Sequence, residues 1–466
     1  MKGTKVLGLV LAPAFLFVAH LIPESDAISR NGIISAVVML AVLVLLISEA
    51  LPHSLAALFG PASLIFLGVA TPGQAFFGFS NHVVYFILTS AVISHALSSA
   101  GISKRVLYAI LKRVGGSVEA VVAGLMVCTA ILSALTSNIA TVLIFLPLCL
   151  DFLEIYDNEE DKRRTGRTLM LALPIATGIG CVFTPAGSSL HLLMLGLLES
   201  ATGFTVPFFS WMLIGIPWVA FVLPVGILAV IKLNKPAPLS REKLDTFVKT
   251  LAATKKMNFK EKYILIVILA ILAAWIVSTW VPFFQITAVA VIGCIFLILS
   301  GHEGLKWKEV EPSLPWTIVF MVGSFISMTH VLTLTGASTW LARILVPTTV
   351  DLPIITLSLI VALVAFVMLI LIPQQTALIP VMSVPVLALA GVAGVNPVTL
   401  MMVMAFTVST TYLLPYSSVP LLTYVKGYFS KGDLAKTTLV IQVWLGIVTA
   451  LWVPFMVGVL GLGVYY

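Results

Sequence analysis

Long apolar runs, each nearly free of charge, recur from one end of the 466-residue chain to the other. About 20 such residues in a row are enough for a helix to cross the hydrocarbon core of a membrane. Apolar residues make up 60% of the chain and charged residues only 10%, so a soluble fold could not bury this much apolar surface. The runs also lack the apolar–polar alternation of an outer-membrane barrel. The sequence therefore predicts an all-α polytopic membrane protein.

The runs are of two kinds. Nine are short enough for one crossing, whereas four are longer and have Pro, Gly or clustered polar residues near the middle. Such interruptions are tolerated at membrane depth only where the backbone lines a cavity or is buried in protein. We expect two of the long runs to be re-entrant hairpins and two to be broken helices that cross. The simple spans are 6–22, 32–50, 55–71, 82–100, 206–231, 263–282, 285–300, 315–335 and 437–459; the hairpins are 117–153 and 353–392, and the broken helices are 168–203 and 397–425.

The distribution of basic residues supports this choice. With eleven crossings, two hairpins and a cytoplasmic N-terminus, all of the 26 lysines and arginines except Arg30 and Arg343 fall on the cytoplasmic side. Cytoplasmic loops of membrane proteins carry such an excess. The net charge of +7 therefore reflects topology rather than nucleic-acid binding. We predict a multi-pass protein of the inner (plasma) membrane with its C-terminus outside and a basic cytoplasmic loop at 233–262, whose lysines set the topology or also contact anionic lipid.

The chain contains an internal repeat. At an offset of 235 residues, five positions of 84–103 are identical in 319–338, and each segment precedes a hairpin and then a broken helix. In the predicted topology the two segments cross in opposite directions. Inverted repeats with discontinuous helices in matching places point to a secondary transporter. We expect an extra transmembrane helix at 1–31, a first repeat at 32–232, and a second repeat at 263–466; the matched pairs are Val84 and Val319, His95 and His330, Leu97 and Leu332, Gly101 and Gly336, and Ser103 and Ser338.

Uncharged polar residues gather where the first hairpin turns. Its tip, 135–141, carries Thr136, Ser137, Asn138 and Thr141 within an apolar run. A hairpin tip exposes amides and carbonyls that have no intrahelical partner. Oxygens suit a hard cation such as Na⁺, and amides at a helix N-terminus suit an anion. The alternative is that these side chains only join helices by hydrogen bonds.

The second hairpin and the broken helices repeat this chemistry. Adjacent Gln374 and Gln375 are costly in the apolar run of the second tip, 372–377, unless their amides are satisfied. In the broken helices Pro185 and Pro415, which match at an offset of 230, each remove a backbone donor. We interpret these breaks as ion-binding sites, with a simple proline kink as the alternative.

At these residues the chain resembles the divalent-anion/sodium symporter family. The resemblance rests on Ser137-Asn138 with Ala140-Thr141, close to that family's Ser-Asn-Thr signature, and on Thr184-Pro185-Ala186-Gly187-Ser188 in the broken helix. The order of the elements resembles that of the family over nearly the whole chain. The resemblance implies a scaffold and a transport domain, an elevator-like motion and a homodimer. Members of the family carry succinate, malate, fumarate, citrate or sulfate with Na⁺, and some exchange dicarboxylates.

The resemblance also implies roles for individual residues. The chain departs from the family where Ile139 replaces a Thr and where the second signature becomes Gln374-Gln375-Thr376. Two further departures are Ser188-Ser189-Leu190-His191 and Ser418-Val419-Pro420-Leu421, in place of Thr-Pro-Pro-Asn. The implied sodium ligands are Ser137, Asn138 and Gly187 for one ion, and Gln375, Pro415 and Ser417, near Thr376, for a second. The residues implied to face the substrate are Asn138, Ser188, Thr376, Gln375 and Ser418.

We therefore predict a sodium-coupled symporter of small di- or tricarboxylate anions, with sodium ions and no organic cofactor. No acidic residue falls at mid-membrane, where a proton relay would use one, so sodium is favoured over protons. His95 and His330 could instead titrate, or serve as structural hydrogen-bonding groups. The alternatives are a sodium-independent dicarboxylate exchanger, a sulfate or other oxyanion transporter and, more remotely, an ion channel. We expect no enzymatic activity, because the only catalytic candidates, His95 and His330, lack carboxylate neighbours in the sequence. The sequence also has no phosphate-binding GxxxxGK[ST] loop, so we expect no ATP-driven pump.

Overall fold

The structure is a computed structural model. In the residues that it describes, the regular secondary structure is entirely helical. Eight helices there are long and apolar enough to cross a membrane, and seven shorter apolar helices of 10–17 residues accompany them. The predicted all-α membrane fold is confirmed. The number of eleven crossings, which needs some of the shorter helices as well, stays a prediction. The residues that the structure describes are 2–19, 22–24, 28–114, 116–252, 257–281, 283–299, 305–345, 350–372 and 374–463.

One helix lies at each predicted simple span, although several of these helices extend beyond the predicted bounds. These helices are α1 (Lys2–Ala19), α2 (Arg30–Ile47), α3 (His53–Phe66), α5 (His82–Ser99), α11 (Phe208–Asn234), α13 (Phe259–Val277), α14 (Ile286–Leu299), α16 (Trp316–Leu334) and α22 (Lys431–Val459). Several short or charged helices between the spans form no long apolar run and were not predicted. They are α4 (Pro72–Ala75), η1 (Phe77–Ser80), α6 (Ile102–Val114), α12 (Arg241–Ala252), α15 (Trp307–Val310), η5 (Glu311–Ser313) and α17 (Ala337–Leu345).

Each of the four interrupted runs consists of two helices. The hairpins are α7 (Val118–Ser133) with α8 (Asn138–Leu153), and α18 (Ile354–Leu371) with α19 (Gln375–Val392). The first broken helix is α9 (Glu159–Gly180), then the short turns η2 (Cys181–Phe183) and η3 (Pro185–Gly187), then α10 (Ser189–Thr202). The second is α20 (Pro397–Thr410) followed by α21 (Ser418–Tyr424). The helices therefore stop and restart at the polar clusters seen in the sequence.

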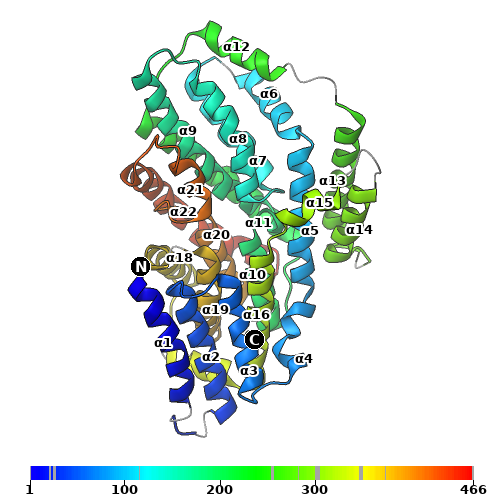
Figure 1. Ribbon diagram of the computed structural model, residues 1–466, viewed down its shortest axis with the longest axis vertical. Helices are drawn as coiled ribbons and strands as arrows, with labels where there is room; N and C mark the ends of the chain where they lie inside the picture. Colours follow the sequence, from blue (N-terminus) through cyan, green and yellow to red (C-terminus); the bar gives the residue numbers. More distant parts are fainter. Residues whose placement is uncertain are drawn as a thin grey trace.

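The order of elements in the first half recurs in the second. In both halves a long helix (α5 or α16) is followed by an amphipathic helix, a hairpin, a broken helix and a last long helix. Each of two contacts between the halves has an equivalent with the halves interchanged. The contact of α3 with α16 corresponds to that of α14 with α5, and the contact of α9 with α21 corresponds to that of α20 with α10. In Figure 1 the hairpin α7–α8 lies in the upper part of the molecule and α18–α19 in the lower part.

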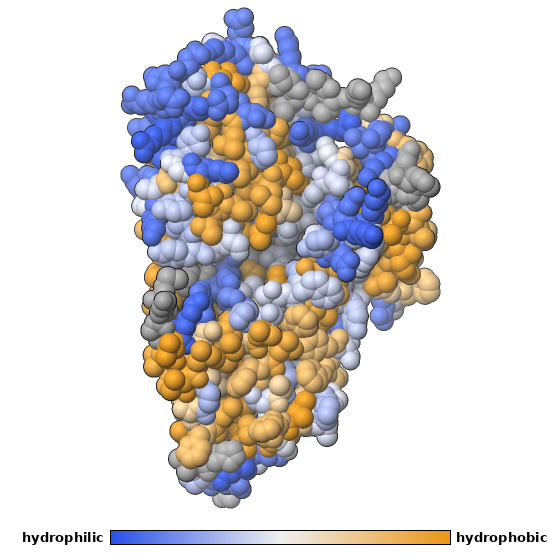
Figure 2. Space-filling model, viewed as in Figure 1, coloured by the Kyte–Doolittle hydropathy of each residue, from blue (hydrophilic) through white to orange (hydrophobic). Residues whose placement is uncertain are grey.

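Several segments that we predict to be cytoplasmic meet at one end of the molecule. The Tyr156 hydroxyl donates to the carbonyl of Ala237 at 2.8 Å, which joins the connector after the first hairpin to the chain after α11. Arg105 and Glu261 form a 2.7 Å ion pair between α6 and α13. This end, with α12, is uppermost in Figure 1, and Figure 2 shows hydrophilic residues gathered over it and hydrophobic residues over much of the surface below. The connectors that follow α5, the first hairpin and α11 thus share one polar end, whereas α15 of the predicted cytoplasmic segment 301–314 lies near mid-height in Figure 1.

The basic loop 233–262 contains a helix that docks on the first hairpin. In α12, Phe247 packs edge-on against Phe152 of α8, with ring centroids 4.9 Å apart. Lys243 of the same helix forms a 2.6 Å ion pair with Asp157. The loop therefore has a packed face as well as a basic one. Within it, residues 253–256, which include Lys255 and Lys256, lie outside the described residues.

Candidate functional site

The tip of the first hairpin is built around the N-terminus of α8. The Ser137 hydroxyl caps this helix by accepting the N–H of Ala140 at 3.3 Å, and the Ser137 N–H donates to the hydroxyl of Ser94 on α5 at 3.0 Å. The half-buried Asn138 accepts the hydroxyl of Ser133 at its Oδ1, at 2.8 Å. The tip thus places polar side chains at the positive end of a helix dipole, which favours a negative charge nearby.

Carbonyl oxygens gather beside this tip, at the break in the first broken helix. Because residue 185 is Pro, the carbonyl of Cys181 cannot receive the N–H that a continuous helix would supply. A Cβ atom at Gly187 would lie 2.3 Å from the carbonyl oxygen of Cys181 and 2.8 Å from that of Ser133. Both oxygens therefore crowd Gly187, where only glycine fits. Clustered neutral oxygens are suitable ligands for a hard cation such as Na⁺.

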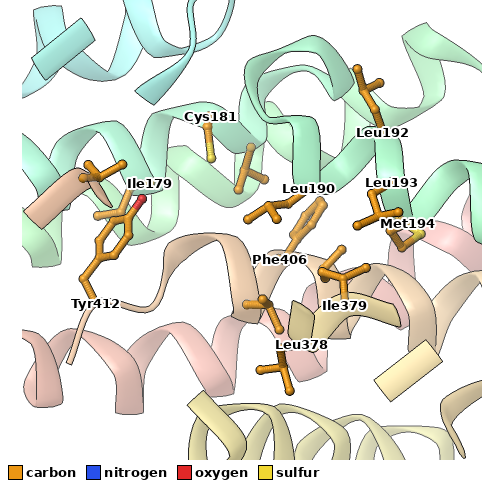
Figure 3. Close-up of a cluster of buried hydrophobic side chains, with 14 of the residues drawn as sticks. Ile179, Cys181, Leu190, Leu192, Leu193, Met194, Leu378, Ile379, Phe406 and Tyr412 are labelled. Atoms are coloured by element: carbon orange, nitrogen blue, oxygen red, sulfur yellow. The ribbon is translucent and has the colours of Figure 1, made fainter. Parts of the chain in front are cut away.

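The first hairpin also contacts the second broken helix. Asn138 Nδ2 donates to the hydroxyl of Tyr412 at 3.2 Å, and Tyr412 is only 2% exposed. The Tyr412 ring packs against Gly178 of α9, where a Cβ would lie 2.5 Å from the ring. Figure 3 shows this ring beside Ile179, with Cys181 nearby and apolar side chains of α10, α19 and α20 packed alongside. Tyr412 was not among the predicted site residues, although it stands in the polar break after α20.

The second hairpin meets its own broken helix through Gln375. Gln375 Nε2 donates to the carbonyl of Val408 at 2.6 Å and to that of Thr411 at 3.2 Å. Because both partners only accept, the group between them is the NH₂ end of the amide. The Thr411 carbonyl lacks a helical donor because residue 415 is Pro. Pro373 of the predicted tip lies outside the described residues.

The remaining predicted site residues flank these contacts. Ser188 is buried and caps α10 by accepting the N–H of Leu190 at 3.3 Å. Ser417 is buried, Ser418 is exposed, and Thr376 is half-buried in the first turn of α19. Helices of the two halves meet in this region, since α21 packs on α8 and α10 packs on α19. Of the predicted site residues, Ser137 and Gly187 line the cavity described next.

A cavity of about 210 Å³ lies between the first hairpin tip, α5 and the start of α16. Ser90, Ser94 and Ser98 line it at a spacing of four residues, so α5 presents a row of hydroxyls to the tip. This row of serines was not among the predicted site residues, although its helical spacing is visible in the sequence. Among the lining residues that the structure describes there is no Asp, Glu, Lys or Arg. Any anion held here would depend on hydrogen bonds and a bound cation rather than on a fixed positive side chain.

The histidines lie in different surroundings. His95 lines the cavity, whereas His330 stacks on Phe77 with ring centroids 4.2 Å apart. His191 in α10 is fully buried, and its Nε2 lies 2.9 Å from the Ser409 hydroxyl of α20, so it joins the two broken helices. In the described residues no three His, Cys, Asp or Glu side chains come together to hold a metal. The candidate ligands for a cation at this site are therefore neutral oxygen atoms.

Known proteins resemble the chain over most of its length. The sodium-dependent dicarboxylate transporter SdcS of Staphylococcus saprophyticus is 26% identical over 443 residues, which cover 89% of this chain and 84% of that protein. SdcS of Staphylococcus aureus (strain USA300) is 24% identical over 447 residues, with the same coverage.

Solved structures of two transporters share the fold. The Alcanivorax borkumensis YdaH transporter matches with a TM-score of 0.56 at 12% identity, over 84% of this chain and 89% of that one. Neisseria gonorrhoeae MtrF, described within a class of antimetabolite efflux pumps, matches with a TM-score of 0.59 at 13% identity, over 99% and 96%. Both likenesses concern the fold alone.

The resemblance seen in the sequence is confirmed by a family model. The model described as the sodium:sulfate symporter transmembrane region matches residues 3–460, nearly the whole chain. The chain is therefore a member of the sodium:sulfate symporter family, among the symporters of divalent anions and sodium.

Proposed function

We propose that this protein is a sodium-coupled symporter of small di- or tricarboxylate anions such as succinate, malate, fumarate or citrate. The observation that carries this proposal is the pair of carbonyl oxygens, from Ser133 and Cys181, that face Gly187 at the edge of a cavity whose described lining has no Asp, Glu, Lys or Arg. A sodium ion held by these oxygens would place its charge beside the N-terminus of α8. It would then favour an anion in the cavity, and the anion would favour the sodium ion to the same extent. The relatives named as sodium-dependent dicarboxylate transporters support this reading.

The coupling supplies the energy for accumulation. Each sodium ion that moves inward gains the free energy of its concentration gradient and about 2.3 kcal/mol per 100 mV of inside-negative potential, and each negative charge on the anion costs the same electrical energy. The protein itself needs only to bind both ions together and to expose them on alternate sides of the membrane. We propose no chemical step and no organic cofactor.

Sulfate or another oxyanion is the second candidate substrate. The description of the family model, a sodium:sulfate symporter, favours it. A site without a fixed positive charge accepts either class of dianion, because hydroxyls and amides donate equally well to carboxylate and to sulfate oxygens. A sodium-independent dicarboxylate exchanger differs from both symporters, because it would move one dicarboxylate in exchange for another without needing Na⁺.

We also propose how the protein is arranged. Residues 32–232 and 263–466 form two inverted repeats, preceded by the extra helix at 1–31 and joined by the cytoplasmic loop 233–262. The exchanged contacts between the halves and the shared polar end support this arrangement. The N-terminus lies in the cytoplasm and the C-terminus outside the plasma membrane. Two copies form a dimer within the lipid and move the site by an elevator-like motion.

Uptake into proteoliposomes tests the function. Labelled succinate, citrate and sulfate are offered to the purified protein with an inward Na⁺ gradient or with K⁺ in its place. We expect Na⁺-dependent accumulation of a carboxylate. Counterflow from preloaded vesicles identifies an exchanger. The symporter proposal is rejected if no carboxylate shows Na⁺-dependent uptake, and exchange without Na⁺ would support the exchanger in its place.

A further inference from the structure

The two broken helices contain the same backbone defect. Pro185 and Pro415 stand at equivalent positions, 230 residues apart, and each lies four residues after a carbonyl that a helix would otherwise satisfy. These carbonyls belong to Cys181 and Thr411, also 230 residues apart. Since proline supplies no N–H, each half has an equivalent carbonyl that needs another partner. The two halves provide different partners.

In the first half the hairpin amide leaves the carbonyls of the break free. Asn138 donates to the hydroxyl of Tyr412 and its side chain also contacts the thiol of Cys181, but in the described residues it donates to no carbonyl of the broken helix beside it. The carbonyls of Cys181 and Ser133 crowd Gly187, and within the described chain neither accepts a hydrogen bond from a donor outside its own helix. These oxygens are therefore available to a cation.

In the second half the hairpin amide fills the break. Gln375 is one methylene longer than Asn138, and its NH₂ group donates to the carbonyls of Val408 and Thr411 at 2.6 and 3.2 Å. A second amide helps: Gln442 of α22 donates to the carbonyl of Thr410 at 3.4 Å. Gln442 also accepts the Thr411 hydroxyl at 2.8 Å. The carbonyls at the end of α20 are thus satisfied by neutral side chains.

An amide NH₂ group and a sodium ion compete for such oxygens. Both present positive charge to converging carbonyls, and they cannot occupy the same space. Displacing Gln375 would leave a polar amide without its partners in a half-buried position, which is costly. We propose that Gln375 takes the place of a second sodium ion, so that this transporter binds sodium only in its first half and moves one sodium ion with each anion. This inference rests on the proposed function.

The proposal has an electrical consequence. A dianion that moves with one sodium ion carries a net negative charge, so an inside-negative potential opposes its uptake. At equilibrium the accumulation ratio falls about 50-fold for each 100 mV of such a potential. With two sodium ions the transport of a dianion would not respond to the potential.

The ratio of fluxes tests the proposal directly. The initial uptake of ²²Na⁺ and of ¹⁴C-labelled dicarboxylate is measured in the same proteoliposomes, at a pH where the anion is fully ionised. We expect about one Na⁺ per anion and slower uptake when valinomycin and K⁺ impose an inside-negative potential. A wild-type ratio of two or more, or uptake that this potential does not slow, overturns the proposal.

Two variants assign the effect to Gln375. Gln375→Asn shortens the amide by one methylene and frees the carbonyls of Val408 and Thr411; we expect the flux ratio to rise to about two. Gln374→Asn, at the N-cap of the same helix, changes a side chain that makes no capping bond, and the ratio should stay at one. A Gln375→Asn ratio of one with intact uptake refutes the role of this amide. Uptake without Na⁺ dependence rejects the proposed function as well, whereas Na⁺-dependent uptake with a wild-type ratio of two rejects this inference alone.

Discussion

Substitution of Gly187 by Ala tests whether the two crowded carbonyls bind sodium. The added methyl group would lie 2.3 Å from the oxygen of Cys181 and 2.8 Å from that of Ser133, well inside contact distance. Both neighbours are backbone atoms, which cannot rotate away as a flexible side chain would. Overpacking of this kind costs about 1–3 kcal/mol. If the cost falls on the sodium-bound form, the Na⁺ concentration for half-maximal uptake rises about 5- to 150-fold.

The assay is the Na⁺ activation curve of succinate uptake, with the amount of protein in the membrane measured by immunoblot. Gly446→Ala in α22 is the matched control, because a Cβ at Gly446 meets no atom within 4 Å. The control variant should keep the wild-type curve. If Gly187→Ala also keeps it, at equal abundance, the carbonyls beside Gly187 do not bind the coupling ion.

Three further outcomes are expected. Asn138→Ala abolishes uptake but leaves the protein in the membrane, because it removes the amide at the first hairpin tip; near-normal uptake would show that the site lies elsewhere. Tyr412→Phe removes only the hydroxyl that accepts a hydrogen bond from Asn138. Such a bond is worth about 0.6 kcal/mol in a membrane protein, so the rate of transport falls about threefold and keeps its Na⁺ dependence. Complete loss of transport would show that this hydroxyl has a larger role. Single cysteines at the exposed Glu160 and Glu242 react with an impermeant thiol reagent from the cytoplasmic side only, above a low background because the native cysteines are buried; labelling from opposite sides would contradict the proposed topology.

The helices and their interruptions could be predicted from the sequence because both depend on local chemistry. Apolar length predicts a helix, and Pro, Gly and polar clusters predict where it stops. The hairpin tip at Ser137 and Asn138 and the break at Gly187 were found in this way. The short amphipathic helices were missed because their periodicity is brief and they carry charge.

The contacts across the site could not be predicted, because they join residues far apart in the chain. Tyr412 contacts Asn138 although the two residues are 274 positions apart in the sequence, and no pattern in either segment indicates this contact. Gln375 was singled out because a buried amide is costly, but the cost alone does not say which carbonyls satisfy it. Which carbonyls the Gln375 amide reaches depends on the length of its side chain relative to the nearby break after α20.

The exchange of contacts between the halves bears on how the chain is made. Within α9 and the turn after it, 89% of the most apolar stretch is buried, and part of its cover comes from α20 and α21, among the last helices to be synthesised. A nascent chain that ends before residue 397 already packs α7, α8 and α11 on α9, but it lacks the part of the cover that α20 and α21 supply. The first half can therefore begin to pack as it is made, whereas its final assembly waits for the last helices.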